Sequence, residues 1–260
     1  MNITTEQVKE LRDKTGISVM QCKKALEEAG GDMEKALMIL KKKSGDIAAK
    51  KSDRVATDGL VVIKKNGNKA IAVVLNCETD FVSKNEDFVN LANAIADKAV
   101  AEGAPAAKSA AADMISPVVQ KIGENIQLAE VSEIEGTNLG AYIHGGKKGV
   151  IVALSGGDEA LAKDIAMHVA AMNPKYTTMD DVPEEDRKMA VEIFSKEVEE
   201  SGKPEEIKQK ILKGKIDSYF KEQTLLEQPF IKNPDMTIGN LLKTGGAEIK
   251  IEKILTYSLK

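Results

Sequence analysis

Residues 59–75 read GLVVIKKNGNKAIAVVL, and residues 140–154 read GAYIHGGKKGVIVAL. In each stretch, two runs rich in β-branched residues flank a glycine-containing turn, Asn66-Gly67 in the first and Gly145-Gly146 in the second. Asparagine followed by glycine is the strongest short-range signal for a β-hairpin, because both residues tolerate the positive φ of the tight turn. The sequence therefore predicts two hairpins of the same kind.

The two hairpins open two related copies of one longer pattern. A helix is expected after each hairpin, and its apolar pairs recur with the same spacing in both copies: Leu91-Ala92 and Ile95-Ala96, then Leu161-Ala162 and Ile165-Ala166. A third strand is expected in each copy, from residues 123–128 and from residues 246–251, which resemble each other. Both copies read β-β-α-α-β. This order indicates an α+β fold with two related subdomains, residues 55–139 and 140–260, each a small antiparallel sheet with helices on one face.

The first copy contains an extra segment between its hairpin and its helix, residues 76–85, NCETDFVSKN. A duplicated framework supplies rigid structure, and a connection present in only one copy is a place where function can be added. Its centre, Thr79-Asp80-Phe81-Val82, sets a carboxylate beside a large aromatic ring. These residues leave two interpretations open. The segment contacts another molecule, or Phe81 fills the subdomain core while Asp80 caps the next helix.

The second copy has its own insertion, residues 180–228, which predicts an antiparallel helical hairpin. Its first half is acidic and its second half is basic, with Ser201-Gly202-Lys203-Pro204 between them. Glycine ends helices and proline fits the first turn of the next one. We expect the apolar residues of the first helix to face the second helix: Met189, Ile193, Phe194 and Val198. A spacer and a partner-binding arm are equally compatible with this pattern.

The front of the chain predicts three short helices. Thr4 with Gln7, Ser18 with Gln21, and Asp32 have the positions of helix caps. In the loop between the first two helices, residues 15–20, the apolar side chains serve either packing or partner contact.

A basic stretch, residues 41–54, follows these helices and has no clear apolar stripe. It is interpreted as a linker, so that residues 1–54 form an N-terminal domain plus a basic linker. A nucleic-acid-binding arm is the weaker alternative, because Asp46 and Asp53 dilute the charge and no aromatic residue is nearby.

Composition excludes several classes of protein. The 260 residues carry a net charge of −4, and aromatic residues make up 3% of the chain, with no tryptophan. Arginine occurs only at positions 12, 54 and 187. Proteins that bind nucleic acids usually carry a basic face with arginine and stacking rings, so direct nucleic-acid binding is not expected. No apolar run is long enough to cross a bilayer, and no leader pattern opens the chain, so a cytoplasmic protein without membrane contact is expected.

The side chains that most enzymes and metal sites need are sparse. Cys22 and Cys77 are far apart in the sequence, and His144 and His168 are the two histidines. We therefore expect no metal, no cofactor and no catalytic residue, and not an enzyme. His168 shares a helical face with apolar residues and is predicted to be a core histidine with satisfied hydrogen bonds. His144, beside the glycines of the second turn, is a candidate for a surface contact or for a turn hydrogen bond.

Five separated motifs, in order over nearly the whole chain, resemble bacterial elongation factor Ts. They are Val8–Gly16 with Met20–Leu26, Cys77–Val82, Ile165–Ala171, Ser201–Pro204 and Leu225–Phe230. The resemblance implies that the N-terminal helices form a ubiquitin-associated-like domain. It also implies a guanine nucleotide exchange factor that releases GDP from elongation factor Tu, so that GTP can reload this GTPase during translation.

The resemblance also assigns roles to particular residues. Thr79, Asp80, Phe81 and Val82 correspond to the loop that enters the Mg²⁺ and phosphate site of elongation factor Tu in this family. Val19, Met20 and His144 correspond to further contacts with the same GTPase. A homodimer or a heterotetramer with the GTPase is compatible with this assignment. The alternative is a ubiquitin-associated-like adaptor or dimerisation module that binds a partner without promoting nucleotide exchange.

Overall fold

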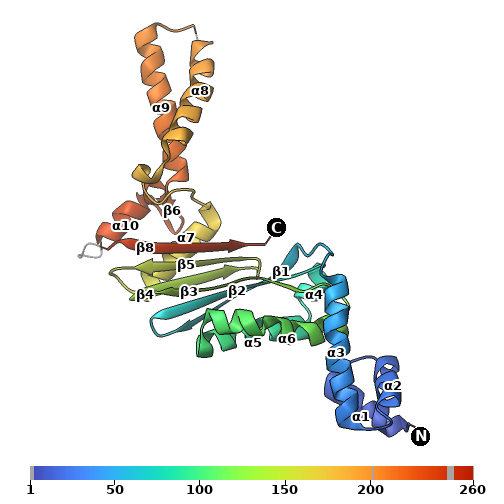
Figure 1. Ribbon diagram of the computed structural model, residues 1–260. Coiled ribbons are helices and arrows are strands. Elements are labelled where there is room, and N and C mark those ends of the chain that lie inside the picture. Colours follow the sequence, from blue (N-terminus) through green and yellow to red (C-terminus); the bar gives the residue numbers. More distant parts are fainter. Residues whose placement is uncertain (1–2, 201, 245–248, 260) are drawn as a thin grey trace. The chain divides into compact units, whose positions relative to one another are not determined.

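The computed structural model of the chain describes residues 3–200, 202–244 and 249–259 (Figure 1). The chain forms two compact units, and each unit takes segments from separate parts of the sequence. Unit 1 comprises Met1–Glu135, Ile143–Gly149 and Thr256–Lys260, and unit 2 comprises Gly136–Tyr142 and Val150–Leu255. Among the described residues, every helix is too short or too polar to span a lipid bilayer. Ser201 and residues 246–248, which contribute to two of the predictions above, lie outside the described residues.

Unit 1 begins with the expected helices, α1 (Thr5–Thr15), α2 (Val19–Glu28) and α3 (Met33–Lys51). The predicted caps are confirmed, because Thr4 and Gln7 form a reciprocal capping box, and the Ser18 and Asp32 side chains each accept backbone N–H groups. The helices enclose a small core of buried side chains: Val8, Leu11, Ile17, Cys22, Ala25, Leu26, Ala36 and Leu40.

The interpretation of residues 41–54 as a linker is wrong for most of its length, because α3 continues to Lys51. Ser44 is buried and donates its hydroxyl to the backbone carbonyl of Lys41, and Ile47 and Ala48 pack against the core of the following sheet. The buried face therefore exists, but serine and alanine occupy part of it. Such small side chains give a weak apolar periodicity in the sequence.

The first sheet confirms the first predicted hairpin. It contains β1 (Asp58–Asn66), β2 (Lys69–Cys77) and β3 (Gln127–Glu135), with β2 in the centre and both neighbours antiparallel to it. Asn66 pairs with Lys69, so the two turn residues are Gly67 and Asn68, one position later than the expected Asn66-Gly67. Gly67 has φ +57°, which favours glycine over residues with a side chain.

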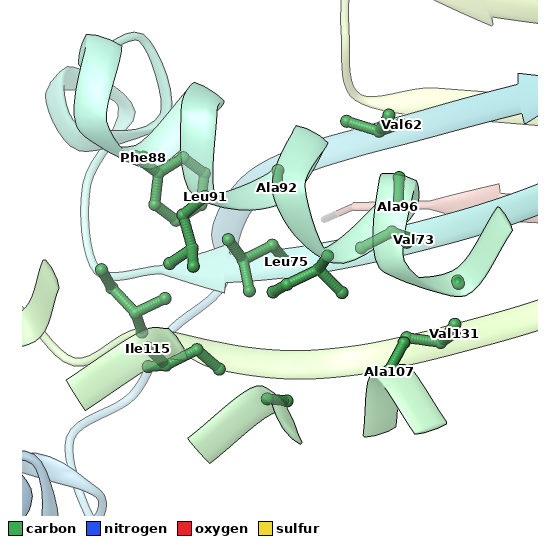
Figure 2. Packing of buried hydrophobic residues seen from close by; sticks show 14 of the residues in the cluster. Val62, Val73, Leu75, Phe88, Leu91, Ala92, Ala96, Ala107, Ile115 and Val131 are labelled. Atoms are coloured by element: carbon green, nitrogen blue, oxygen red, sulfur yellow. The ribbon is translucent and has the colours of Figure 1, made fainter. Parts of the chain in front are cut away.

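Helices α5 (Glu86–Glu102) and α6 (Ala104–Ile122) cover one face of this sheet, and Figure 2 shows the packing between them. Leu75 of β2, Phe88 of α5 and Val119 of α6 are at most 1% exposed. Burying a side chain of this size stabilises the fold by about 1.5–3 kcal/mol. This core forms a firm base for the segment that connects β2 to α5.

The second sheet has the order β4 (Asn138–His144), β5 (Lys148–Leu154) and β8 (Ile251–Ser258). In unit 2, its buried side chains pack with those of α7 (Glu159–Met172) and α10 (Ile238–Thr244). Short elements complete the unit: the 3-10 turns Met179–Asp181 and Leu225–Glu227, and the strand pair β6 (Pro229–Phe230) and β7 (Asn233–Thr237). Mixed helices and small sheets confirm the α+β class.

The insertion in the second copy forms two helices, α8 (Glu184–Glu199) and α9 (Glu205–Gln223), which run side by side (Figure 1). Their predicted charge pairing is confirmed, because the Lys208 ammonium lies 2.7 Å from a Glu199 carboxylate oxygen, and Lys215 pairs with Glu197. Ala190 and Val198 are buried. The Phe194 ring contacts the Tyr219 ring edge-on, and the two ring centroids are 5.4 Å apart.

The expectation that Met189 and Ile193 face α9 is wrong, since they are 60% and 53% exposed. The inner face of α8 instead follows Ala190, Phe194 and Val198, which are spaced by four residues along the helix.

Candidate functional site

The extra segment of the first copy begins with Asn76 and Cys77, the last residues of β2, and contains a single helical turn, α4 (Asp80–Ser83), before α5. The Ser83 amide donates to the Thr79 carbonyl at 3.2 Å, and the Asn85 amide donates to the Val82 carbonyl at 2.9 Å. The sequence predicts only a loop here, because four residues are too few to show helical periodicity.

Phe81 projects from this turn into solvent, with 83% of its surface exposed. Val82, the next residue, is buried and belongs to the core beneath the sheet. The alternative in which Phe81 fills the core is therefore wrong, because Val82 has that position.

The alternative role of Asp80 as a helix cap is also wrong. The side chain of Asn85 caps α5 by accepting the Asp87 amide at 2.9 Å. The exposed Asp80 carboxylate instead accepts a hydrogen bond from the Lys84 ammonium at 2.9 Å. This hydrogen bond raises the pKa of Lys84 above its usual value. The Asp80 carboxylate, whose charge is partly neutralised by Lys84, thus lies next to the exposed ring of Phe81.

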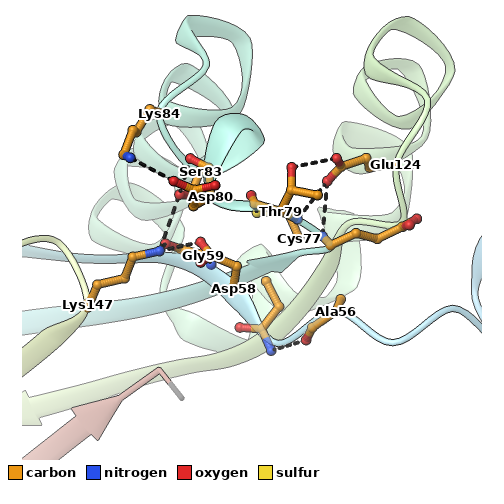
Figure 3. A network of polar contacts seen from close by, with 12 residues as sticks. Ala56, Asp58, Gly59, Cys77, Thr79, Asp80, Ser83, Lys84, Glu124 and Lys147 are labelled. Atoms are coloured by element: carbon orange, nitrogen blue, oxygen red, sulfur yellow. Dashed lines mark hydrogen bonds and ion pairs between the residues drawn. The ribbon is translucent and has the colours of Figure 1, made fainter.

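A carboxylate from outside the segment holds the residues just before α4 (Figure 3). One oxygen of Glu124, Oε2, accepts the backbone amides of Glu78 at 3.1 Å and Thr79 at 3.0 Å. The other oxygen, Oε1, accepts the Thr79 hydroxyl at 2.7 Å. Thr79 has the N-cap position of α4, but its side chain makes no cap hydrogen bond to the helix. Its polar group is directed to Glu124.

A lysine holds the other end of the turn. The Lys147 ammonium contacts the Ser83 hydroxyl at 3.2 Å and the Gly59 carbonyl at 3.0 Å, and it also pairs with the Asp58 carboxylate (Figure 3). Partial burial acts to raise the pKa of Asp58, but hydrogen bonds from Lys147, Ser83 and the Gly59 amide outweigh it and lower this pKa. Asp58 therefore stays ionised under the lysine.

Glycine is required at position 59 by a close approach of two strands. A Cβ atom there would lie 2.1 Å from the Leu75 carbonyl oxygen. Any side chain would push β1 from β2 at the point where Lys147 binds.

His144 lies in the tip of the second hairpin, which belongs to unit 1. The Lys147 amide donates to the His144 carbonyl at 3.0 Å across Gly145 and Gly146, whose φ angles are +56° and +72°. The Gly146 carbonyl accepts the Val61 amide of β1 at 2.8 Å. The His144 side chain is exposed, and its backbone is tied to the lysine that holds α4.

The apolar residues between α1 and α2 divide into two groups. Ile17 is buried at 5% exposure, whereas Val19 and Met20 at the start of α2 are 51% and 63% exposed. Packing is therefore the role of Ile17. Val19 and Met20 remain available for contact.

His168 is confirmed as a core histidine. It is buried, with Nε2 3.0 Å from the Gln228 side-chain oxygen and Nδ1 accepting the Ile231 amide at 3.2 Å. Among the described residues, no group of three or more histidine, cysteine, aspartate or glutamate side chains is arranged to hold a metal ion.

Sequence reasoning missed Glu124, Lys147, Asp58 and Ser83. The single available signal is that Glu124 directly follows Gly123, the left-handed residue that ends α6. An acidic residue just after a helix is common on surfaces, so this signal does not identify a partner.

Comparison with known proteins shows the family. The family model described as "Elongation factor TS" matches residues 78–259. Elongation factor Ts of Hahella chejuensis is 44% identical over 95% of this chain and 89% of that protein. The same-named protein of Pseudomonas fluorescens is 45% identical over 95% of this chain and 88% of its own length. Because these matches extend over most of both chains and include the turn that carries Phe81, the chain belongs to the elongation factor Ts family of translation elongation factors.

Proposed function

We propose that this chain is a guanine nucleotide exchange factor for elongation factor Tu. It binds the GDP-bound GTPase and disturbs the Mg²⁺ and phosphate site through the Thr79–Val82 turn, in which Val82 is buried while Asp80 and Phe81 are exposed. It thereby promotes GDP release so that GTP can reload. It makes and breaks no covalent bond, and it acts in the cytoplasm, where translation elongation occurs. Family membership supports the exchange role in general, and the 83% exposure of Phe81 is the observation that carries the detailed mechanism.

Burial of the exposed Phe81 ring on binding would stabilise the complex with the GTPase. Burying a phenylalanine side chain is worth about 1.5–3 kcal/mol, and Phe81 leaves most of this unused in the free protein. Aromatic side chains that enter a partner's pocket are frequent hot spots of protein interfaces. The exposure of Phe81 therefore supports the role of a wedge, whose ring is buried and stabilises the complex only when the GTPase opens a space for it.

The wedge has a physical target in a GTPase. Mg²⁺ and the phosphate-binding loop supply much of the affinity for nucleotide, so a ring that displaces the elements around the ion weakens GDP binding. Asp80, beside Phe81 and paired with Lys84, brings charged groups to the same place. We assign it to rearranging charges around the ion and not to holding a metal.

One wedge is too little for a large effect on nucleotide affinity. A ten-thousandfold weakening of GDP binding needs about 5.5 kcal/mol of differential contact. Val19 and Met20 are exposed on α2, and His144 is exposed on the second hairpin. We assign these three residues to further contacts with the GTPase, which share the required energy.

The test compares GDP release in the presence of the wild-type chain and of Phe81→Ala. Stopped-flow release of a fluorescent GDP from elongation factor Tu should be at least about tenfold slower with the variant, because truncating an aromatic hot spot costs about 2 kcal/mol or more. Met172→Ala is the matched control, since Met172 is also an exposed large apolar residue, at 46%. Equal rates for wild type and a folded Phe81→Ala chain would refute the wedge.

A further inference from the structure

The turn that carries Phe81 has little means of holding its own shape. Isolated helices shorter than about 12 residues are marginal in water, and α4 spans only Asp80–Ser83. Threonine is a preferred N-cap residue because its hydroxyl can bind the free amides of the first turn. The Thr79 hydroxyl makes no such bond and donates to Glu124 instead. The start of α4 is therefore held from outside.

Glu124 is suited to this task because all three of its contacts converge on two consecutive residues. Its carboxylate receives the amides of Glu78 and Thr79 and the Thr79 hydroxyl, at 3.1, 3.0 and 2.7 Å. Hydrogen bonds to a charged acceptor are about twice as strong as neutral ones. Three of them fix both the position and the direction in which the chain enters α4.

The backbone that carries Glu124 is itself anchored. The Asn125 amide donates to the Glu78 carboxylate at 2.6 Å, so residues 78–79 and 124–125 hold each other reciprocally. The Asn125 side chain donates to the backbone carbonyls of Ser52 at 3.3 Å and Arg54 at 2.6 Å, just after α3. The backbone of Glu124 is thus held in place, and its side chain in turn fixes the position of residues 78–79, which lead into α4.

We propose that Glu124 is a positioning residue for nucleotide exchange, which holds α4 so that Phe81 is presented to the GTPase in one orientation. In this assignment, Thr79 acts inward, on Glu124, and does not contact the partner. The inference rests on the proposed exchange function. Glu124 itself touches neither the nucleotide nor the ion.

The expected effect of losing Glu124 is a looser wedge on an intact fold. Val82 still anchors the turn in the core, and Lys147 still contacts Ser83. Phe81 then samples several orientations, and part of the binding energy is used to order it again. Such a loss reduces the maximal rate of GDP release more than it reduces the affinity for the GTPase.

A set of variants separates geometry from charge. In Glu124→Ala all three contacts are lost. Glu124→Gln can keep them, because its side-chain oxygen can accept both amides while its NH₂ group donates to the Thr79 hydroxyl. Thr79→Val removes only the hydroxyl contact. Glu86→Ala is the matched control, because Glu86 is an exposed glutamate at the start of the neighbouring helix α5.

The measurements are GDP release from elongation factor Tu as a function of chain concentration, and hydrogen exchange of residues 78–84 in the free chain. For Glu124→Ala we expect a maximal release rate lower by about tenfold, with half-saturation changed less than about threefold. Thr79→Val should lie between Glu124→Ala and wild type, and Glu124→Gln should lie within about threefold of wild type. The amides of Glu78 and Thr79 should exchange faster in Glu124→Ala, whereas the Glu86→Ala chain should match wild type in both measurements.

A double variant tests whether Glu124 acts through Phe81. If it does, Glu124→Ala combined with Phe81→Ala is no slower than Phe81→Ala alone, whereas independent effects would multiply. Multiplying effects, or an unchanged release rate in Glu124→Ala, would overturn the proposal. Unchanged hydrogen exchange at residues 78–84 in Glu124→Ala would overturn it as well. Because Thr79→Val removes only the hydroxyl contact, an unchanged release rate in Thr79→Val would overturn the proposal even if Glu124→Ala were too unstable for kinetics. A wild-type chain that leaves GDP release unaltered would refute the exchange function instead.

Discussion

The thiol of Cys77 is unreactive because it is buried, although Cys77 lies shortly before the exposed turn α4 in the sequence. Its sulfur donates to the Thr79 carbonyl at 3.2 Å. Burial, and to a smaller extent the charges of Asp58 and Glu124, raise the pKa of Cys77 to about 12. The thiolate is the reactive form of cysteine, so almost none of it is present at neutral pH.

We predict that Cys77 does not react with a thiol reagent at about pH 8 while the chain is folded. The test uses Cys22→Ala, in which Cys77 is the one remaining thiol. The absorbance of the released reagent group should rise only after denaturant is added. Rapid modification under native conditions would mean that residues 77–79 open frequently, contrary to the held turn described above.

His168 is neutral in the folded protein for a clear geometric reason. The Ile231 amide donates to Nδ1, so the ring proton lies on Nε2 and is donated to the Gln228 oxygen. Burial lowers the pKa of His168, and the Gln228 hydrogen bond offsets this only in part. In a protonated ring, Nδ1 would carry a proton as well. This proton would face the N–H of Ile231, and the hydrogen bond between them would be lost.

Stability should therefore fall as the pH is lowered through the range of histidine titration. The unfolded chain takes up a proton on His168 near pH 6.5, and the folded chain resists it, so the unfolded state is favoured below that pH. The free energy of unfolding by urea should fall between about pH 7.5 and 5.5, by at most about 1.4 kcal/mol per pH unit. This decrease of the free energy of unfolding with falling pH should vanish in His168→Gln and persist in His144→Gln. A slope that survives in His168→Gln would assign the effect to another group.

Among the elements, α3 shows how a helix can be hidden in a sequence that resembles a linker. Its second half is rich in lysine and contains Gly45, a poor helix former. The buried contacts of Ser44, Ile47 and Ala48 nevertheless hold it in place. Tertiary packing, and not intrinsic propensity, supplies most of the stability of such a helix.

Substitution of Gly45 tests whether this segment is helical in solution. Apart from its chain neighbours and the backbone of its own helix, a Cβ atom at position 45 in α3 would meet no atom within 4 Å, so Gly45→Ala should stabilise the chain by about 0.5–1 kcal/mol. Gly30 has equally open surroundings but a φ of +64°, so Gly30→Ala should destabilise it by about 1 kcal/mol or more. Thermal or urea unfolding measures both changes. No stabilisation in Gly45→Ala would indicate that residues 41–51 are a linker after all.

For the whole molecule, exchange activity requires that chain and nucleotide weaken each other's binding. Coupling between two ligands of one protein is reciprocal, so the factor by which the chain weakens GDP binding equals the factor by which GDP weakens chain binding. An adaptor or dimerisation module without exchange activity has no such coupling. The two interpretations thus differ in a measurable equilibrium quantity.

We predict that saturating GDP releases the chain from elongation factor Tu. Calorimetry or fluorescence titration should give a dissociation constant that is much larger with GDP than without nucleotide, by the same ratio found for GDP with and without the chain. Phe81→Ala should reduce that ratio, and Met172→Ala should leave it unchanged. An affinity independent of GDP would support the adaptor interpretation.

Much of the fold could be read from short-range patterns. The caps at Thr4 and Asp32 and the turn at Gly67 rest on contacts within a few residues, or on one backbone angle, and these leave direct traces in the sequence. Exposed Phe81, in contrast, could not be told from a core residue, because an aromatic ring in a short connection is compatible with either. The burial of its neighbour Val82 resolved this.

The support of the candidate site comes from partners that are distant in the chain. Glu124 reaches Thr79 across 45 residues, and Lys147 reaches Ser83 across 64. Local periodicity and cap chemistry identify helices and hairpins, because those signals depend on near neighbours. Comparison of the two copies identifies the Thr79–Val82 segment, because it lies in a connection that only the first copy has. Which carboxylate and which lysine hold that segment depends on how sheets and helices pack, since side chains without sequence proximity meet only when the core is formed.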